Sequence, residues 1–338
     1  MGEVALERAH LAARCSAGRP PRGRPVLVAP AAPAALALLL AILPGLPTTS
    51  RRADASPGPP PAPPVRVAVS IPPAAYFVER IGGPAVRVTT MVPAGSEEET
   101  YTPTPRQVGD FLRARLYVAV GHPAFPLETR YLLPLLRSHP EVHLALMSRG
   151  VRPIPMGGGA AGESGAPGAG ATDPHIWLAP DTVAIAARNI TDGLAAVDPS
   201  RREAYERGLD AFQHDLRALD AAFRRIARAP RKVRFLAYHP AWGYLAREYG
   251  FEQRAVEAGG KEPGAAGLVA LIAAARRDGV RLVLIPPGFP PSTAAALAGA
   301  IDGKLLPLDH LAHDWLAGMW RLEGALAEVA GLAKGPPR

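Results

Sequence analysis

The sequence predicts an α/β protein of two Rossmann-like lobes, each a small parallel sheet with helices, joined by one long rigid helix. Three observations indicate this fold: two sets of short β-branched runs, helical stretches between the runs of each set, and one apolar stripe of helical period between the two sets. A chain of 338 residues with 48% hydrophobic residues is long enough to bury two cores.

The N-terminal residues 1–55 are interpreted as a signal peptide or N-terminal anchor. Arginines precede an apolar run over residues 26–46, which is typical of an export signal. Prolines interrupt this run, and its dense part is short for a membrane span of about 20 residues, which favours a cleaved signal. Residues 56–64 are Pro-rich and predict a stiff linker. We therefore expect a periplasmic or other extracytoplasmic location.

The charge and the cysteine content exclude two classes of function. Residues 1–55 hold seven arginines against three acidic residues, so half of the net charge of +8 lies there. No cluster of basic and aromatic residues occurs in the sequence, which argues against a nucleic-acid partner. Cys15 is the single cysteine, which excludes an intramolecular disulfide and a cysteine-based metal cluster.

The β-branched runs place the strands of a first lobe, residues 65–196, and of a second lobe, residues 231–332. Those of the first lobe cover residues 65–71, 86–92, 116–121 and 142–147, and those of the second cover 232–238, 251–257, 281–286 and 305–308. The segments between them are long enough for crossover helices, which predicts parallel pairing. The low-complexity residues 156–172 contain no histidine, and we expect them to form a mobile surface loop.

Residues 197–230 are predicted to form the linking helix. Asp198 and Pro199 suit a helix N-cap and a first helical position. Apolar residues then recur at spacings of three and four: Leu209, Phe212, Leu216, Leu219, Phe223 and Ile226. A helix from Pro199 to Arg228 is roughly 45 Å long at 1.5 Å per residue and would limit the lobes to small tilts. The alternative is an ordinary packing helix.

Metal-binding side chains stand near the carboxyl ends of the predicted strands, which is where open parallel sheets bind ligands. His239 and Asp309 each follow a strand of the second lobe. In the first lobe, an acidic triplet that ends at Glu99 follows the second strand, and His175 precedes a helical stretch. Imidazoles and carboxylates from both lobes suit a divalent ion held in a cleft between them.

Each of these side chains also has a structural interpretation. A histidine near a strand end is commonly hydrogen-bonded without metal, an acidic triplet commonly forms a solvated turn, and Asp309 is able to cap the helix that follows. Three further histidines in the same regions are auxiliary candidates for the metal: His122, His310 and His313.

Several ordered motifs resemble the substrate-binding proteins of zinc and manganese ABC importers, over residues 65–329. These are SIPPAAYFVERIGG (70–83), VPAGSEEETYTPTPRQV (92–108), DPHIWLAP (173–180), YHPAWGYLAREYGF (238–251), GGKEP (259–263) and LPLDHLAHDWL (306–316). The resemblance implies two α/β lobes joined by one long helix, and a metal site that takes one ligand from each of four loops.

The resemblance implies His175, His239 and Asp309 as three of the metal ligands. Glu99 stands where the family usually has histidine, so the fourth ligand is either Glu99 or, in a site with three protein ligands, water or His122. Two histidines with two carboxylates lie between the preferences of zinc and manganese. The histidine at position 239 favours zinc, with manganese and iron as alternatives.

The function implied is that of an extracytoplasmic, monomeric receptor without enzymatic activity. It captures a divalent transition metal and delivers it to the membrane permease of an ABC importer. One alternative is a zinc-dependent hydrolase, against which the absence of an HExxH motif argues. Another is an adhesin-like protein whose metal is structural, in which case removal of the metal would unfold the chain.

Overall fold

A computed structural model describes residues 62–332 with the exception of residues 97, 157–171, 258–262 and 288–290. The predicted signal or anchor, most of the Pro-rich linker and most of the low-complexity loop lie outside the described residues. Within the described part of the chain, no helix has the length and apolar character needed to cross a membrane.

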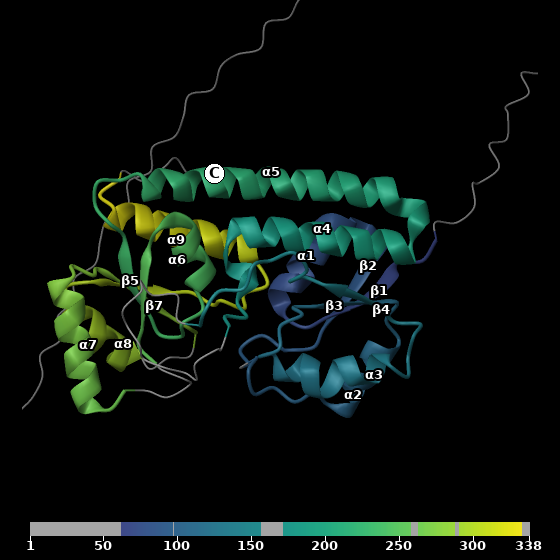
Figure 1. Cartoon of the computed structure of the whole chain (residues 1–338), viewed down its shortest axis with the longest axis horizontal. Coiled ribbons are helices and arrows are strands. Elements are labelled where there is room, and N and C mark those ends of the chain that lie inside the picture. Colours follow the sequence, from purple (N-terminus) through teal and green to yellow (C-terminus); the bar gives the residue numbers. More distant parts are fainter. Residues whose placement is uncertain (1–61, 97, 157–171, 258–262, 288–290, 333–338) are drawn as a thin grey trace, which may run out of the picture. The chain divides into compact units, whose positions relative to one another are not determined.

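The first lobe is a four-stranded parallel sheet with the strand order β2-β1-β3-β4 (Figure 1). Its strands are β1 (Val65–Val69), β2 (Val86–Thr90), β3 (Leu116–Ala119) and β4 (His143–Leu146). Its helices are α1 (Pro72–Gly82), α2 (Pro105–Leu112), α3 (Leu133–Leu136) and α4 (Pro180–Val197), with short helical turns at Gly83–Ala85, Leu127–Leu132 and Ile176–Leu178. The strands lie within the four predicted runs.

The second lobe repeats this arrangement, with four parallel strands in the order β6-β5-β7-β8. Its strands are β5 (Arg234–Ala237), β6 (Glu252–Ala255), β7 (Leu282–Ile285) and β8 (Lys304–Pro307). Its helices are α6 (Gly243–Tyr249), α7 (Ala265–Arg277), α8 (Pro291–Ala300) and α9 (Trp315–Val329). The prediction of two α/β lobes with parallel sheets is confirmed.

Helix α5 (Arg202–Ala227) joins the lobes and has 26 residues, after a 3-10 turn at Pro199–Arg201. All members of the predicted apolar stripe are buried in it. The helix contacts α1 and α4 of the first lobe and α6 and α9 of the second, along the edge seen in Figure 1. The prediction of a long linking helix is confirmed, although its regular part begins after Pro199, where Asp198 instead accepts hydrogen bonds from Arg201 and Tyr205.

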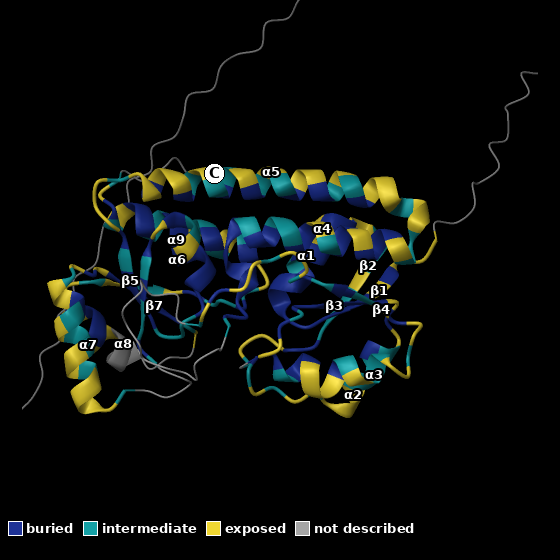
Figure 2. Ribbon diagram, in the orientation of Figure 1, coloured by how far each residue is buried: buried dark blue, intermediate teal, exposed yellow. Residues whose placement is uncertain are grey.

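One hydrophobic core extends through both lobes and under α5, as the dark face of that helix in Figure 2 shows. Phe77 of α1, Phe212 of α5 and Trp315 of α9 meet at ring-centroid distances of 5.2–6.3 Å. A second, smaller core lies under α7 and α8. Because the larger core includes residues of both lobes, wide separation of the lobes would expose apolar surface to water.

Candidate metal centre

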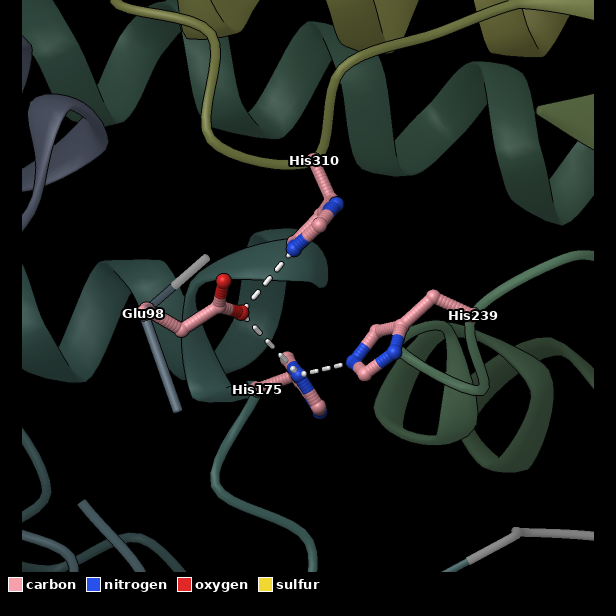
Figure 3. A group of neighbouring side chains, drawn as sticks. All are labelled: Glu98, His175, His239 and His310. Carbon is pink, nitrogen blue, oxygen red and sulfur yellow. Dashed lines mark hydrogen bonds and ion pairs between the residues drawn. The ribbon is translucent and has the colours of Figure 1, made fainter. Parts of the chain in front are cut away.

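Four loops bring together Glu98, His175, His239 and His310 (Figure 3). Glu98 lies in the loop after β2, and His175 lies immediately before the turn Ile176–Leu178. His239 and His310 follow β5 and β8 of the second lobe. Each lobe therefore supplies two side chains, and one potential ligand atom from each residue lies within 4.8 Å of the others.

Three of the six distances between these atoms are close to the edges of a coordination tetrahedron. The Nε2 atoms of His175 and His239 are 3.1 Å apart. The Oε1 atom of Glu98 is 2.9 Å from Nε2 of His310 and 3.6 Å from Nε2 of His175. A tetrahedral zinc ion with bonds of about 2.0–2.1 Å has ligand-to-ligand edges of about 3.3 Å. The group thus offers three imidazole nitrogens and one carboxylate oxygen within 4.8 Å of one another, close enough to converge on one ion.

Burial and close charged neighbours shift the pKa values of two side chains of the centre, Glu98 and His175. Burial alone raises the pKa of Glu98, but the neighbouring His310 and His175 outweigh it and hold this pKa well below its usual range. Burial alone lowers the pKa of His175, but Asp173 and Glu98 outweigh it and raise this pKa to about 10. The empty centre therefore carries an anionic Glu98 and a protonated His175. A metal ion has to displace this proton before it binds.

Carboxylates orient the two histidines that face each other. Nδ1 of His175 is 2.7 Å from Oδ1 of Asp173, which also accepts the backbone N–H of His175. Nδ1 of His239 is 2.5 Å from Oε1 of Glu257. A carboxylate accepts the Nδ1–H, so each ring turns its Nε2 atom toward the centre. The absence of a side chain at Gly243 makes room for Asp173, because a Cβ there would lie 2.3 Å from Oδ2 of Asp173.

The structure brings together two of the four residues expected as ligands, His175 and His239. Glu99 is not in the group: its side chain is 41% exposed and its Oε1 lies 3.9 Å from Nε2 of His239. The preceding residue, Glu98, occupies the centre and has a side chain only 2% exposed. The loop therefore turns Glu98 inward and Glu99 toward solvent.

Asp309 is also outside the group, and its neighbour His310 is inside it. Oδ1 of Asp309 accepts the backbone N–H of Leu311 at 2.8 Å, which engages this carboxylate in the turn after β8. The sequence had indicated His310 as an auxiliary candidate because it flanks the Asp309 loop. The acidic triplet indicated the region of Glu98. It did not indicate which of its residues is buried, because side chains in a loop do not alternate with a regular period.

The remaining auxiliary histidines have other partners. Nε2 of His122 lies 2.8 Å from the hydroxyl of Thr172, and its Nδ1 accepts the N–H of Ala124. Nε2 of His313 lies 2.9 Å from the carboxylate of Glu79, and both of these side chains are about half exposed. Neither histidine belongs to the group of four.

Comparisons with known proteins identify a family and relatives of similar sequence. A family model described as zinc-uptake complex component A, periplasmic (ZnuA), matches residues 67–319. The iron-binding protein YfeA of Yersinia pestis is 31% identical over 179 residues, 52% of this chain and 54% of YfeA. The high-affinity zinc uptake system protein ZnuA of Bacillus subtilis is 33% identical over 143 residues, 42% of this chain and 45% of that protein. The chain thus matches about half the length of these curated relatives.

A solved structure supports the same assignment over more of the chain. The crystal structure of a ZnuA deletion mutant with zinc bound superposes with a TM-score of 0.68 and 32% sequence identity. The match covers 81% of this chain and 100% of that chain. Together with the family match over residues 67–319, these likenesses show that the chain belongs to the ZnuA family of periplasmic zinc-uptake components.

Proposed function

We propose that this protein is an extracytoplasmic receptor that captures a divalent transition metal, with zinc favoured, and delivers it to the permease of an ABC importer. The observation that carries the proposal is the convergence of Glu98, His175, His239 and His310 within 4.8 Å. Three nitrogens and one oxygen suit zinc better than manganese, which prefers oxygen ligands. The relatives named as zinc uptake and iron-binding proteins support zinc first and iron as an alternative.

Capture would join the lobes through the metal. Glu98 and His175 belong to the first lobe, whereas His239 and His310 belong to the second. A bound ion would therefore favour the arrangement of the lobes that keeps all four ligands in place. Protonation of His175, or a small displacement of one lobe, would weaken the bonds and allow transfer to the permease.

The ligand set also supports a receptor rather than an enzyme. A catalytic zinc keeps an open coordination position for water or substrate, whereas four protein ligands close a tetrahedral site. The extensive core includes none of the four side chains of the centre, which supports a protein that stays folded when empty. Among the described residues, Tyr131 and Val269 are the exposed large hydrophobic side chains, which supports a monomer.

The location outside the cytoplasmic membrane is supported by two facts. The matching family is described as periplasmic. In the sequence, arginines also precede the apolar run over residues 26–46, which is typical of an export signal.

Calorimetric titration of the purified chain with zinc tests the proposal against the His175→Ala/His239→Ala double variant. We expect one tight zinc site in the wild type and its loss in the double variant. Equal affinity of the two proteins would refute the proposal. Circular dichroism after chelation separates the other functions: unfolding of the empty protein would indicate a structural metal. Chelation-sensitive turnover of esters or peptides would indicate a hydrolase.

A further inference from the structure

Two adjacent residues after β8, Asp309 and His310, both carry side chains able to bind a metal, and His310 is the one that lies in the centre. A carboxylate there would give two nitrogens and two oxygens, whereas an imidazole gives three nitrogens and one oxygen. Oxygen-rich sites favour manganese, and nitrogen-rich sites favour zinc. The conformation of this turn therefore affects which metal is preferred.

A single peptide group holds the turn in its observed conformation. The carbonyl of His310 accepts a hydrogen bond from the indole N–H of Trp177 at 2.8 Å. The N–H of Leu311, which belongs to the same peptide group, donates to Oδ1 of Asp309 at 2.8 Å. The peptide is thus fixed at both ends, and the carboxylate of Asp309 is occupied by it. Rotation of this peptide would break both bonds and free Asp309.

Trp177 is itself firmly placed. Its side chain is fully buried, and its ring packs against Phe125 and His175 at centroid distances of 6.4 and 5.2 Å. Its carbonyl accepts the indole N–H of Trp315 at 2.6 Å. Trp177 also lies two residues after His175, so one short segment presents a ligand and fixes the loop that carries another.

The imidazole of His310 reaches the centre as a result. Its Nε2 atom lies 2.9 Å from Glu98, and its ring stacks on that of His239 at a centroid distance of 5.2 Å and an interplanar angle of 20°. Figure 3 shows His310 directed at Glu98 from its own loop.

We propose that Trp177 is a positioning residue that selects His310 over Asp309 as the fourth ligand and thereby favours zinc over manganese. This inference rests on the proposed function, because it concerns the metal preference of the same centre. The physical basis is the hydrogen bond from the indole to the His310 carbonyl, which keeps the peptide, and with it Asp309, turned away from the metal.

Single variants of the full chain test the ligand assignment, with dissociation constants for Zn²⁺ and Mn²⁺ measured by chelator competition. His310→Ala should weaken zinc binding by about 100-fold or more, because loss of an outer partner alone weakens metal binding by about 10- to 100-fold. Asp309→Asn should leave the zinc constant within about threefold, since an amide oxygen still accepts the Leu311 N–H. A loss for Asp309→Asn as large as that for His310→Ala would overturn the inference.

Trp177→Phe tests the selection, because phenylalanine keeps an aromatic ring but lacks the N–H donor. Loss of one hydrogen bond should weaken zinc binding by roughly tenfold. The manganese constant should weaken less, and the visible bands of bound Co²⁺ should shift, because a carboxylate oxygen replaces an imidazole nitrogen. In this background, Asp309→Asn should also begin to weaken metal binding. Equal losses of zinc and manganese affinity, with an unchanged Co²⁺ spectrum, would overturn the selection.

Asp309→Ala is a second test that remains available if Trp177→Phe fails to fold, because Asp309 lies outside the hydrophobic core. It removes the acceptor of the Leu311 N–H and should weaken zinc binding, whereas Asp309→Asn should not. Identical zinc constants for both variants and the wild type would refute the role of this peptide. Failure of the wild type to bind zinc would instead refute the proposed function.

Discussion

A rise from about pH 7 to about pH 9 should tighten zinc binding by about a hundredfold, because each pH unit below the pKa of a protonated ligand costs about tenfold in affinity. The group responsible is His175, which hydrogen bonds and ion pairs with Asp173 and Glu98 hold at a pKa of about 10 in the empty protein. The neutral imidazole that binds zinc is therefore a minor species at neutral pH.

The magnitude follows from the distance between the pH and this pKa. Near pH 7, about one chain in a thousand carries neutral His175, which costs about 4 kcal/mol of the intrinsic zinc affinity at 1.36 kcal/mol per unit. The empty state holds a proton that the loaded state lacks, so affinity rises with pH. It levels off when the pH passes the pKa of His175, about 10.

Calorimetry in buffers of different ionisation enthalpy counts the protons released on binding. We expect about one proton from His175 between about pH 7 and 8, and a matching slope of log Kd against pH under zinc buffering. Asp173→Asn should move the pH range of this proton release to lower pH, because Asp173 contributes most to raising the pKa of His175. Glu323→Gln, whose partner is Arg225, is the matched control and should leave the slope unchanged. A flat log Kd with no released proton would refute the reasoning.

Three further predictions concern orientation, stability and packing. Glu257→Gln removes the carboxylate 2.5 Å from Nδ1 of His239 and should weaken zinc binding by about 10- to 100-fold, with an altered tautomer in histidine ¹⁵N NMR spectra; an unchanged Kd would contradict this role. The empty protein should lose about 3–4 kcal/mol of unfolding free energy as the pH rises from about 7 to 10, because a raised histidine pKa stabilises fully below its unfolded value and this stabilisation disappears as the pH passes the folded value. The group with the raised pKa is His175, from 6.5 to about 10. Urea titrations in which the zinc-loaded protein loses as much unfolding free energy over the same pH range would argue against this cause. Gly208→Ala should destabilise the chain by about 1–3 kcal/mol, since a Cβ there would lie 2.1 Å from the carbonyl oxygen of Ile81; an unchanged melting temperature would show that α5 shifts without cost.

The regular elements were predictable because their patterns have a period. Each strand falls within or next to a predicted β-branched run, and the stripe from Leu209 to Ile226 is buried on α5. Gly208 carries no such signal, although its missing side chain allows α5 to approach α1. Close approach depends on the partner helix, which a helical spacing cannot reveal.

The ligands show where sequence reasoning stops. Two of the four predicted ligands lie one residue away from the side chains that the structure gathers at the centre: Glu99 beside Glu98, and Asp309 beside His310. In a loop, neighbouring side chains differ only in local backbone direction, which tertiary contacts such as that of Trp177 with the His310 carbonyl decide. His175 and His239 had no competing histidine beside them.

The arrangement of core and ligands determines how such a centre is able to release metal. Phe77, Phe212 and Trp315 join helices of both lobes through α5, so wide opening would break a shared core. Coordination bonds, however, tolerate errors of only about 0.2 Å in length. A shift of about 1 Å between the lobes would therefore disrupt the bonds of His239 and His310 to an ion held by Glu98 and His175, while small sliding of packed helices would keep the shared core closed to water. A receptor built in this way needs only a small tilt to change from capture to delivery.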